Sequence, residues 1–465
     1  MNQISHKKPK IGVLALMLEA YEPIFPGITE AQNRYVHEVL DSIKDTAEYV
    51  FPKVAVNRAD MEELTARYNT EKLDGIIIFM LSYSQGQYLV RAMQQNHLPL
   101  ALALIQPNQS ALPAYGEWEY TVNQGIHGSQ DNANCLRRAG IPCVFFAGDR
   151  TKGAFPKFMA DFAAAARTAA AMKTMRIGII GKLAGMGDVI TDDMAFYRKL
   201  GPEFIYDSIG TVQSLCASAT KEEVEAAMAK DREIFDIDPA MPAERHETAA
   251  RQYVGIKKYL EQNGYAGYTI HFDEFGADGR FTQLPFLAAS SLMAEGYGYA
   301  AEGDATTTAL GAIMNRLCGE SNFSEMYMMD FARKAILLCH AGEGNWATAA
   351  SKPYLMDRIF NEGGLSNPPT PVFTPRPGRA AVLSLVHEGG ENFKLVMAQG
   401  EILPDHDLTR CDMPYMFFRP DSGVEACVTR WLGEGGTHHE TIVLGEHAAR
   451  IRLWCRLCGI VLVEL

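Results

Sequence analysis

The chain has 465 residues, more than one hydrophobic core usually holds, so we expect two or three domains. Its net charge of -13 argues against nucleic acid or an anionic membrane as a partner, because both would repel it. No apolar stretch reaches the roughly 20 residues that span a bilayer. Nine irregularly spaced cysteines are typical of reduced thiols, so we expect a cytoplasmic protein.

The first part of the chain alternates apolar runs with amphipathic segments. The pattern predicts strands at 10–17, 48–55, 75–81, 98–105 and 141–149, and helices at 27–45, 59–70, 86–95, 123–138 and 153–172. Continuously apolar strands such as GIIIFML are typical of a parallel sheet covered on both faces. We therefore predict a doubly wound, flavodoxin-like α/β domain over residues 1–172.

A second α/β pattern follows. It predicts a strand and glycine turn at 175–188, helices at 220–234 and 241–263, a strand at 268–273 and a helix at 286–295. The glycines of GKLAGMGD match neither of the common nucleotide-binding motifs, so we expect a turn that faces a ligand. Residues 173–330 are predicted to form a central α/β domain.

The last part of the chain changes character after a proline- and glycine-rich connector at 363–379. Short alternating segments predict strands at 380–387, 392–403, 413–418, 426–432, 440–445 and 459–465. We therefore predict an antiparallel, barrel-like β-domain over residues 331–465. Cys455 and Cys458 form a CxxC pair without a second ligand pair, so we place them in a buried C-terminal strand rather than in a zinc site.

Charged side chains interrupt two otherwise apolar or glycine-rich stretches. Glu302, Glu325 and His340 lie within 296–343, and His438 and His439 lie in GEGGTHHE. Buried carboxylates are costly unless they are paired, protonated or bound to a cation. Oxygen and imidazole ligands without a thiolate suit Mn²⁺, Mg²⁺ or a similar divalent ion.

Each of these residues also has a structural interpretation. Glu302 can interact favourably with the dipole at the start of a helix. Glu325 can form an ion pair at the surface, and His340 can form a hydrogen bond in the core. His438 and His439 can belong to a hairpin loop. Because adjacent side chains on a strand point to opposite faces, we expect at most one of these two histidines to bind a metal.

A divalent metal with a carboxylate beside it supports a defined set of reactions. The metal polarises a carbonyl and its neighbouring hydroxyl, and a carboxylate whose pKa is tuned upward moves a proton between the adjacent carbons. Aldose–ketose isomerisation, aldol chemistry and hydration all use these parts, and the residues alone do not choose among them.

Several motifs together resemble the L-arabinose isomerase family, within the broader L-fucose/L-arabinose isomerase-like group. They are NQGIHG at 123–128, QLP at 283–285, GYGYAAEGD at 296–304, FSEMYMMDF at 323–331, CHAGE at 339–343 and GGTHH at 435–439. The resemblance implies two α/β domains, a barrel-like β-domain and a sugar substrate. It also implies homo-oligomers, trimers or hexamers, whose active sites lie near subunit interfaces.

The resemblance further implies roles for individual residues. The metal ligands, for Mn²⁺ or for Mg²⁺ or Co²⁺, would be Glu302, Glu325, His340 and His439. Glu302 and Glu325 would also be the catalytic acid/base pair that moves a proton between C1 and C2 through an ene-diol. The substrate-binding residues would be His127, Phe272, Asp304, Phe323, Tyr83 and Met186. His438 would be a neighbour that orients His439.

Two departures from the family pattern concern the substrate. After the first strand the chain reads LMLEAYE, which places Met17 at a sugar-binding position, and HAGEGNW follows the metal histidine where the family has HMLEVCP. A different pentose, a hexose or a deoxysugar is therefore a candidate. The alternatives to an isomerase are a metal-dependent epimerase or lyase on the same site, and a non-catalytic sugar-binding relative.

Overall fold

The computed structural model describes residues 8–182, 185–276, 279–360, 364–404 and 407–465. The chain divides into two compact units, and neither is one continuous stretch. The N-terminal unit runs to Ala171 and takes in Ala449–Gly459, whereas the C-terminal unit comprises Met172–Ala448 and Ile460–Leu465. The described residues include no helix long and apolar enough to cross a membrane.

The N-terminal unit is a five-stranded parallel sheet with helices on both faces. Its strands are β1 (Lys10–Leu16), β2 (Glu48–Val50), β3 (Gly75–Met80), β4 (Leu100–Leu104) and β5 (Val144–Ala147). Its helices are α1 (Tyr21–Ile24), α2 (Ile28–Ser42), α3 (Arg58–Thr70), α4 (Gly86–Met93), α5 (Glu117–Asn123), α6 (Gly125–Arg138), α7 (Ala154–Met172) and α16 (Ala448–Cys458). The strand order is β2-β1-β3-β4-β5.

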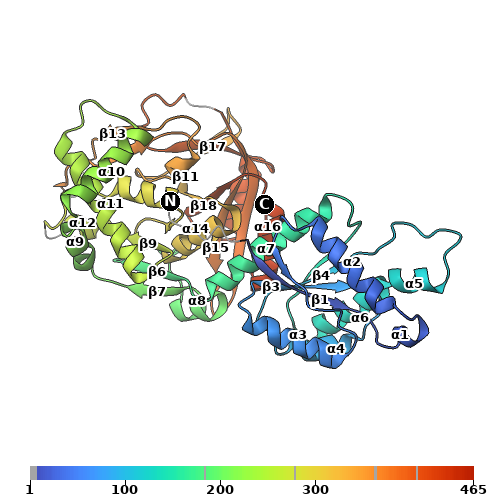
Figure 1. Cartoon of the computed structure of the whole chain (residues 1–465). Helices are drawn as coiled ribbons and strands as arrows, with labels where there is room; N and C mark the ends of the chain where they lie inside the picture. Colours follow the sequence, from blue (N-terminus) through green and yellow to red (C-terminus); the bar gives the residue numbers. More distant parts are fainter. Residues whose placement is uncertain (1–7, 183–184, 277–278, 361–363, 405–406) are drawn as a thin grey trace. The chain divides into compact units, whose positions relative to one another are not determined.

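Side chains of β1 alternate between the two helix layers. Ile11 and Val13 lie in the core with residues of α2 and α7, while Leu14 and Leu16 pack with residues of α3, α4 and α6. Figure 1 shows α2 and α7 on one side of the sheet and α3, α4 and α6 on the other. Both faces of the sheet are therefore buried, as the continuously apolar strands predict.

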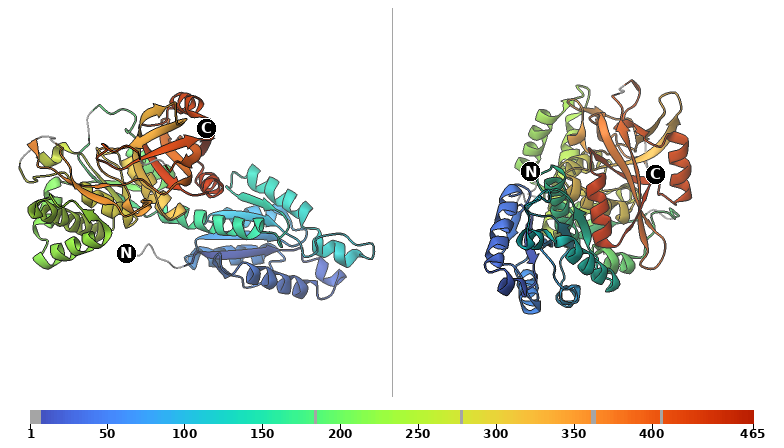
Figure 2. Two further views of the ribbon diagram at one scale, coloured as in Figure 1. Left: turned by 90° about the horizontal axis from the view of Figure 1, so that it is seen from above. Right: turned by 90° about the vertical axis from the view of Figure 1, so that its right-hand side faces the viewer.

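The C-terminal unit begins with a second parallel sheet of order β10-β9-β6-β7. Its strands are β6 (Arg176–Ile180), β7 (Glu203–Tyr206), β9 (Gly267–Ile270) and β10 (Gly298–Tyr299). The helices around it are α8 (Asp193–Leu200), α9 (Ile209–Ala217), α10 (Lys221–Ile234), α11 (Ala243–Asn263), α12 (Asp273–Gly276), α13 (Phe286–Ala294) and α14 (Ala305–Cys318). Figures 1 and 2 show the green helices α9 to α11 along one side of this unit.

A closed antiparallel barrel completes the C-terminal unit. Its strands are β11 (Asn322–Asp330), β12 (Ala335–Cys339), β15 (Gly378–His387), β16 (Phe393–Ile402), β17 (Tyr415–Pro420) and β18 (His439–Leu444). They run in the order β15-β18-β11-β12-β17-β16, and pairing of β15 with β16 closes the ring. Strand β19 (Val461–Glu464) adds to β16 in parallel. The predicted fold class, parallel α/β followed by an antiparallel barrel, is confirmed.

Shorter elements lie beside these two sheets. Strands β8 (Asp236–Ile237), β13 (Tyr354–Asp357) and β14 (Pro369–Val372) form a small sheet, η1 (Trp346–Thr348) is a single turn, and α15 (Val424–Gly433) precedes β18. The predicted connector at 363–379 thus contains a strand. Glu325, expected in the central domain, lies on barrel strand β11, and the three-domain division remains a prediction.

Two expected strands are helical. The segment predicted as a strand at 426–432 lies in α15, whose buried residues Val424, Cys427 and Trp431 are spaced for one face of a helix and pack into the barrel core. Cys455 and Cys458 lie in α16, where the buried residues again have helical spacing. The strand that follows, β19, is only partly buried.

The buried carboxylate of Glu295 joins the end of α13 to α11 and α10 through ion pairs with two lysines that are partly exposed. Lys257 Nζ lies 2.8 Å from one oxygen of Glu295, Lys230 Nζ lies 2.9 Å from the other, and the Tyr253 hydroxyl donates to the same carboxylate. Burial would raise the pKa of Glu295, but these partners together lower it below the usual value of 4.5. The charged pair therefore stabilises the fold above pH 4.5 and loses its contribution as the pH falls through the lowered pKa.

We expect Glu295→Gln to lower the free energy of unfolding by about 2 kcal/mol at pH 7, because two lysines lose their shared anion. The difference from wild type should shrink as the pH falls below about 4.5, where Glu295 of the unfolded chain takes up a proton, and should disappear as the pH falls through the lowered native pKa. Urea unfolding at pH 7 and pH 4 measures both values. Glu261→Gln, at an exposed position on α11, is the control, and a difference that does not depend on pH would contradict the assignment.

Candidate active site

A strained turn between β10 and α14 presents Glu302. Glu302 has φ +65°, a left-handed conformation that is uncommon outside glycine, and Gly303 follows with φ +84°. The Glu302 backbone N–H donates to the Ile270 carbonyl at 3.3 Å, and the Gly303 N–H donates to Thr269 Oγ1 at 2.9 Å. Strand β9 thus holds the turn in place, and such strain is concentrated at functional sites in proteins.

Gly303 also lies against the loop that follows β6. A Cβ atom at this position would lie 2.6 Å from the Gly181 carbonyl oxygen and 2.6 Å from the Lys182 Cα atom. These are backbone atoms that cannot rotate away, so the position requires glycine both for its φ and for its space.

We expect Gly303→Ala to lower the free energy of unfolding by about 2 to 4 kcal/mol, because it adds a steric clash to backbone strain. Gly264 is a matched control. It also has a positive φ, +64°, but nothing lies within 4 Å of its added Cβ, so Gly264→Ala should cost only about 1 kcal/mol. Chemical denaturation of both variants measures the difference, and equal losses would refute the steric argument.

Three adjacent parts of the barrel bring the other charged groups together. Glu325 on β11 is directly opposite Cys339 on β12 and His439 on β18. His340 follows the last residue of β12. The antiparallel register therefore places side chains that are far apart in sequence at the same end of the barrel.

The imidazole nitrogens converge on the two carboxylates. His439 Nε2 lies 3.4 Å from Glu302 Oε2 and 3.3 Å from Glu325 Oε1, yet it is buried without a hydrogen bond of acceptable geometry. The Nε2 atoms of His340 and His438 lie 3.9 and 3.7 Å from the same Glu325 oxygen. We refer to these five residues as the carboxylate–imidazole cluster.

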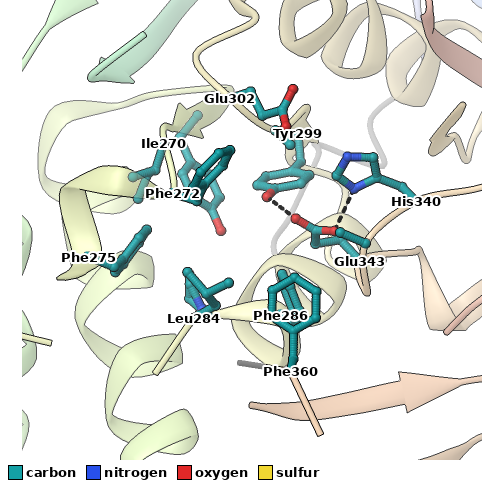
Figure 3. A pocket seen from close by; sticks show the side chains of 14 residues that line it. Ile270, Phe272, Phe275, Leu284, Phe286, Tyr299, Glu302, His340, Glu343 and Phe360 are labelled. Atoms are coloured by element: carbon teal, nitrogen blue, oxygen red, sulfur yellow. Dashed lines mark hydrogen bonds and ion pairs between the residues drawn. The ribbon is translucent and has the colours of Figure 1, made fainter. Parts of the chain in front are cut away.

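Hydrogen bonds fix the ring orientations of His340 and His439, the two buried histidines of the cluster. Asp304 accepts a 3.0 Å hydrogen bond from His439 Nδ1, and Glu343 accepts one of 2.8 Å from His340 Nδ1. The Tyr299 hydroxyl donates to the other Glu343 oxygen at 2.8 Å (Figure 3). Carboxylates on Nδ1 leave Nε2 directed into the cluster, which is the usual arrangement around a metal-binding histidine.

The charges of the cluster shift its pKa values. Burial would lower the pKa of His439, but its hydrogen bond to Asp304 and the nearby carboxylates of Glu302 and Glu325 raise it well above the ordinary value. His439 in turn lowers the pKa of Glu302, against the effect of burial. The site thus favours a positive charge beside His439 Nε2, either a proton or a metal ion.

The donor set suits a divalent cation. Ligand atoms of Glu302, Glu325, His438 and His439 lie within 4.8 Å of one another. Oxygen and imidazole donors of this kind suit Mn²⁺, Mg²⁺ or Co²⁺, and the unpartnered Nε2 of His439 is the buried polar atom that such an ion would satisfy. This grouping contains His438 in place of the expected His340.

The expectation that His438 and His439 point to opposite faces is wrong. Strand β18 begins at His439, so His438 lies before the strand and does not follow its alternation. The centroids of the two rings are 4.2 Å apart, and both Nε2 atoms face Glu325. His438 Nδ1 is held at 2.7 Å by Asp188. His340 is buried and His438 is exposed, and either ring lies near enough to complete the cluster.

A cavity of about 250 Å³ adjoins the cluster. Glu302, His340 and Glu343 line one part of it, and aromatic and aliphatic side chains line the rest (Figure 3). Phe272, a predicted substrate residue, is among the lining residues and stacks on His271.

The other predicted substrate residues lie in different surroundings. Phe323 is buried edge-on against the rings of His340 and His439. Asp304 is fully buried, and its oxygens are engaged by His439 and by the Thr307 N–H at the start of α14. Met186 lies partly buried in the loop after β6.

The remaining sugar-binding predictions fall in the N-terminal unit. Tyr83 and His127 stack there with ring centroids 5.2 Å apart, and His127 is exposed. The placement of Met17 at a sugar-binding position is contradicted, because Met17 is fully buried in the core of this unit. An apolar residue that ends a central strand favours such burial over ligand contact.

Sequence reasoning missed the residues that orient the histidines. Glu343 is three residues after His340, within the quoted CHAGE motif, and this spacing is the signal that could have identified it. Tyr299 and Asp188 have no comparable signal, because their contacts join segments that are distant in sequence.

Comparisons with known proteins agree with this arrangement. The family model of the L-arabinose isomerase central domain matches residues 187–320, and that of the C-terminal domain matches residues 320–461. L-arabinose isomerase of Clostridium beijerinckii is 24% identical, over 96% of this chain and 94% of that protein. L-arabinose isomerase 1 of Bacillus licheniformis is 25% identical over the same shares.

Among solved structures, a periplasmic solute-binding protein of Actinobacillus succinogenes with bound D-allose aligns with 67% of this chain and 92% of its own. The identity is 12% and the TM-score is 0.17, too low to indicate a shared fold.

The C-terminal unit combines an α/β sheet with a closed barrel and holds carboxylates and imidazoles beside a cavity. Together with the sequence matches, these features define an enzyme of the isomerase class. The chain belongs to the L-arabinose isomerase family, as a member with low identity to the relatives above.

Proposed function

We propose that this protein is a divalent-metal-dependent aldose–ketose isomerase that moves hydrogen between C1 and C2 of a sugar. The observation that carries the proposal is the environment of His439. Its Nδ1 is held by Asp304, and its buried Nε2, which has no hydrogen bond of acceptable geometry to any described residue, lies 3.4 Å from Glu302 and 3.3 Å from Glu325. A histidine that only makes a structural hydrogen bond in the core would not require two further carboxylates beside its second ring nitrogen.

Four residues would hold the metal, which we propose to be Mn²⁺ or else Mg²⁺ or Co²⁺. They are Glu302, Glu325, His340 and His439, with His438 as the neighbour beside His439. A bound divalent ion supplies a Lewis acid that polarises the sugar carbonyl and the adjacent hydroxyl. Asp304 and Glu343 would orient the two buried imidazoles, and this role accounts for the full engagement of Asp304 inside the protein.

Glu302 and Glu325 would transfer the proton. One carboxylate takes the proton from C2 of the aldose, and a carboxyl group returns a proton to C1 after the ene-diol has formed. We expected a carboxyl with a raised pKa, but the pKa of Glu302 is lowered, chiefly by the neighbouring His439 imidazole. A lowered pKa keeps Glu302 ionised, which suits the step that removes a proton.

The setting of the enzyme is part of the proposal. We infer a cytoplasmic homo-oligomer, a trimer or hexamer, in which Tyr83 and His127 contribute to sugar binding near a subunit interface. Cys135, Cys216, Cys339 and Cys427 are free thiols, as a reducing compartment requires. The stacked rings of Tyr83 and His127 form a partly exposed aromatic surface of the kind that contacts sugars.

A substrate panel tests the proposed function. The purified protein is incubated with Mn²⁺ and with L-arabinose and other aldopentoses and aldohexoses in D₂O. We expect ketose to form and deuterium to enter the product. Epimer formation or carbon–carbon cleavage without ketose would show the related epimerase or lyase. Absence of any turnover, together with absence of bound metal, would refute the enzyme assignment.

A further inference from the structure

The cavity beside the cluster has a polar end and an apolar end. Glu302 and His340 line the polar end, and the rest of the wall consists chiefly of apolar side chains. These are Ile270, Phe272, Phe275, Leu284, Phe286 and Phe360. In Figure 3, Phe275, Phe286 and Phe360 lie on the side of the space away from Glu302, and Phe272 lies nearer to Glu302.

We propose that the substrate is an aldose whose end remote from the carbonyl is apolar, a 6-deoxy-aldohexose with a terminal methyl group. This inference rests on the proposed isomerase function. The reacting carbons lie at Glu302, and the methyl group lies among the phenylalanines.

Polar groups near the apolar end are largely satisfied within the protein. The Tyr299 hydroxyl is used by Glu343, and Glu343 is used in turn by His340. A terminal hydroxymethyl group would therefore lose its hydrogen bonds to water without gaining replacements. A methyl group loses nothing there and gains contact with aromatic rings.

The Tyr268 hydroxyl is the exception among the described lining residues. It is fully buried and has no hydrogen-bond partner among the described residues. This one buried hydroxyl can form a hydrogen bond with a sugar hydroxyl at a carbon other than C6, which a deoxysugar and its parent hexose both carry. Tyr268→Phe should therefore lower kcat/KM for both sugars of a matched pair by the same factor.

The size of the cavity agrees with this class of ligand. An apolar cavity of roughly 150 Å³ accommodates benzene. The cavity here, about 250 Å³, is larger and has room for a six-carbon chain at its polar and apolar ends together. A five-carbon sugar would leave the phenylalanine-lined end without a partner.

Matched sugar pairs test the proposal, since they differ only at C6. The pairs are L-fucose and L-galactose, L-rhamnose and L-mannose, D-fucose and D-galactose, and 6-deoxy-D-glucose and D-glucose. For the configuration that the enzyme accepts, we expect kcat/KM of the deoxysugar to exceed that of the parent by about 10- to 100-fold. Calorimetric binding of the corresponding pairs of alditols to the Mn²⁺-loaded protein gives a second readout that does not require turnover.

A polar group placed in the apolar end should reduce the preference. Phe275→Tyr adds one hydroxyl to a lining residue, and we expect the ratio within the pair to fall by at least threefold. Phe281→Tyr is the control, because Phe281 packs edge-on against Phe275 but is not among the lining residues. Thermal melting verifies that both variants are folded.

Each outcome is decisive. Equal or better turnover of the parent hexose, or turnover of L-arabinose alone, would overturn the deoxysugar proposal and leave the isomerase function intact. Alditol pairs that bind equally would also overturn it. Failure of every aldose together with absence of bound metal would instead refute the isomerase function.

Discussion

Glu302→Gln should reduce kcat by about 10²- to 10⁴-fold, the usual contribution of a positioned acid or base. The amide keeps the size of the side chain but cannot accept the proton from C2. The decisive measurement is deuterium incorporation from D₂O into the product, with the Mn²⁺ content of the variant measured in parallel. Both values are needed because Glu302 lines the cavity and also lies 3.4 Å from His439 Nε2.

Glu225→Gln, an exposed position on α10, is the control and should keep the wild-type rate. If Glu302→Gln binds Mn²⁺ and keeps full turnover, the proton-transfer role is falsified. If the variant loses both bound Mn²⁺ and activity, a Mn²⁺ titration separates the two effects. A saturating concentration of Mn²⁺ should restore metal binding but should not restore kcat.

Mn²⁺ should raise the melting temperature of metal-free protein by roughly 5 °C when it is present at a hundredfold excess over its dissociation constant. The reason is electrostatic: the native site gathers Glu302 and Glu325 beside Asp304 and Glu343, whereas the unfolded chain does not. A cation that binds this arrangement selectively stabilises the folded state.

The matched variant for this experiment is His439→Gln, which removes the buried nitrogen at the centre of the cluster. It should abolish the shift, whereas His97→Gln, outside the cluster in the N-terminal unit, should preserve it. Protein stripped with a chelator and scanned with Mn²⁺, Mg²⁺ and Co²⁺ gives the order of preference. A melting temperature unaffected by all three ions would contradict the metal site.

Strands and helices of the α/β parts could be predicted because single segments carry their own pattern. The run at 75–81 is apolar throughout and is buried as β3. In contrast, 426–432 contains alternating apolar residues as well as helical spacing. The barrel selects the helix, because Cys427 and Trp431 must face the same core. Such tertiary selection cannot be read from a short segment.

The site was predictable where motifs carry it and unpredictable where folding creates it. Glu302, Glu325 and His439 were expected together, and both carboxylates lie within 3.4 Å of His439 Nε2. The barrel register places Glu325 opposite His439, and the turn between β10 and α14 presents Glu302. The position of His438 depended on the residue at which β18 begins, a boundary that sequence reasoning places poorly. Likewise, the contact of Asp304 with His439 joins the start of α14 to β18, which are distant in sequence and meet only when helix and barrel strand pack together.

The interleaved sequence of the two units has a consequence for biosynthesis. Helix α16 belongs to the N-terminal unit, where Leu453 and Leu457 pack against its core and Arg450 pairs with Asp161, but it is translated only after the intervening segment Met172–Ala448. At about 5 to 20 residues per second, the ribosome needs roughly 15 to 60 seconds to go from Ala171 to Gly459. Part of the core of the N-terminal unit therefore stays uncovered until the ribosome has synthesised the segment Met172–Ala448 and then α16.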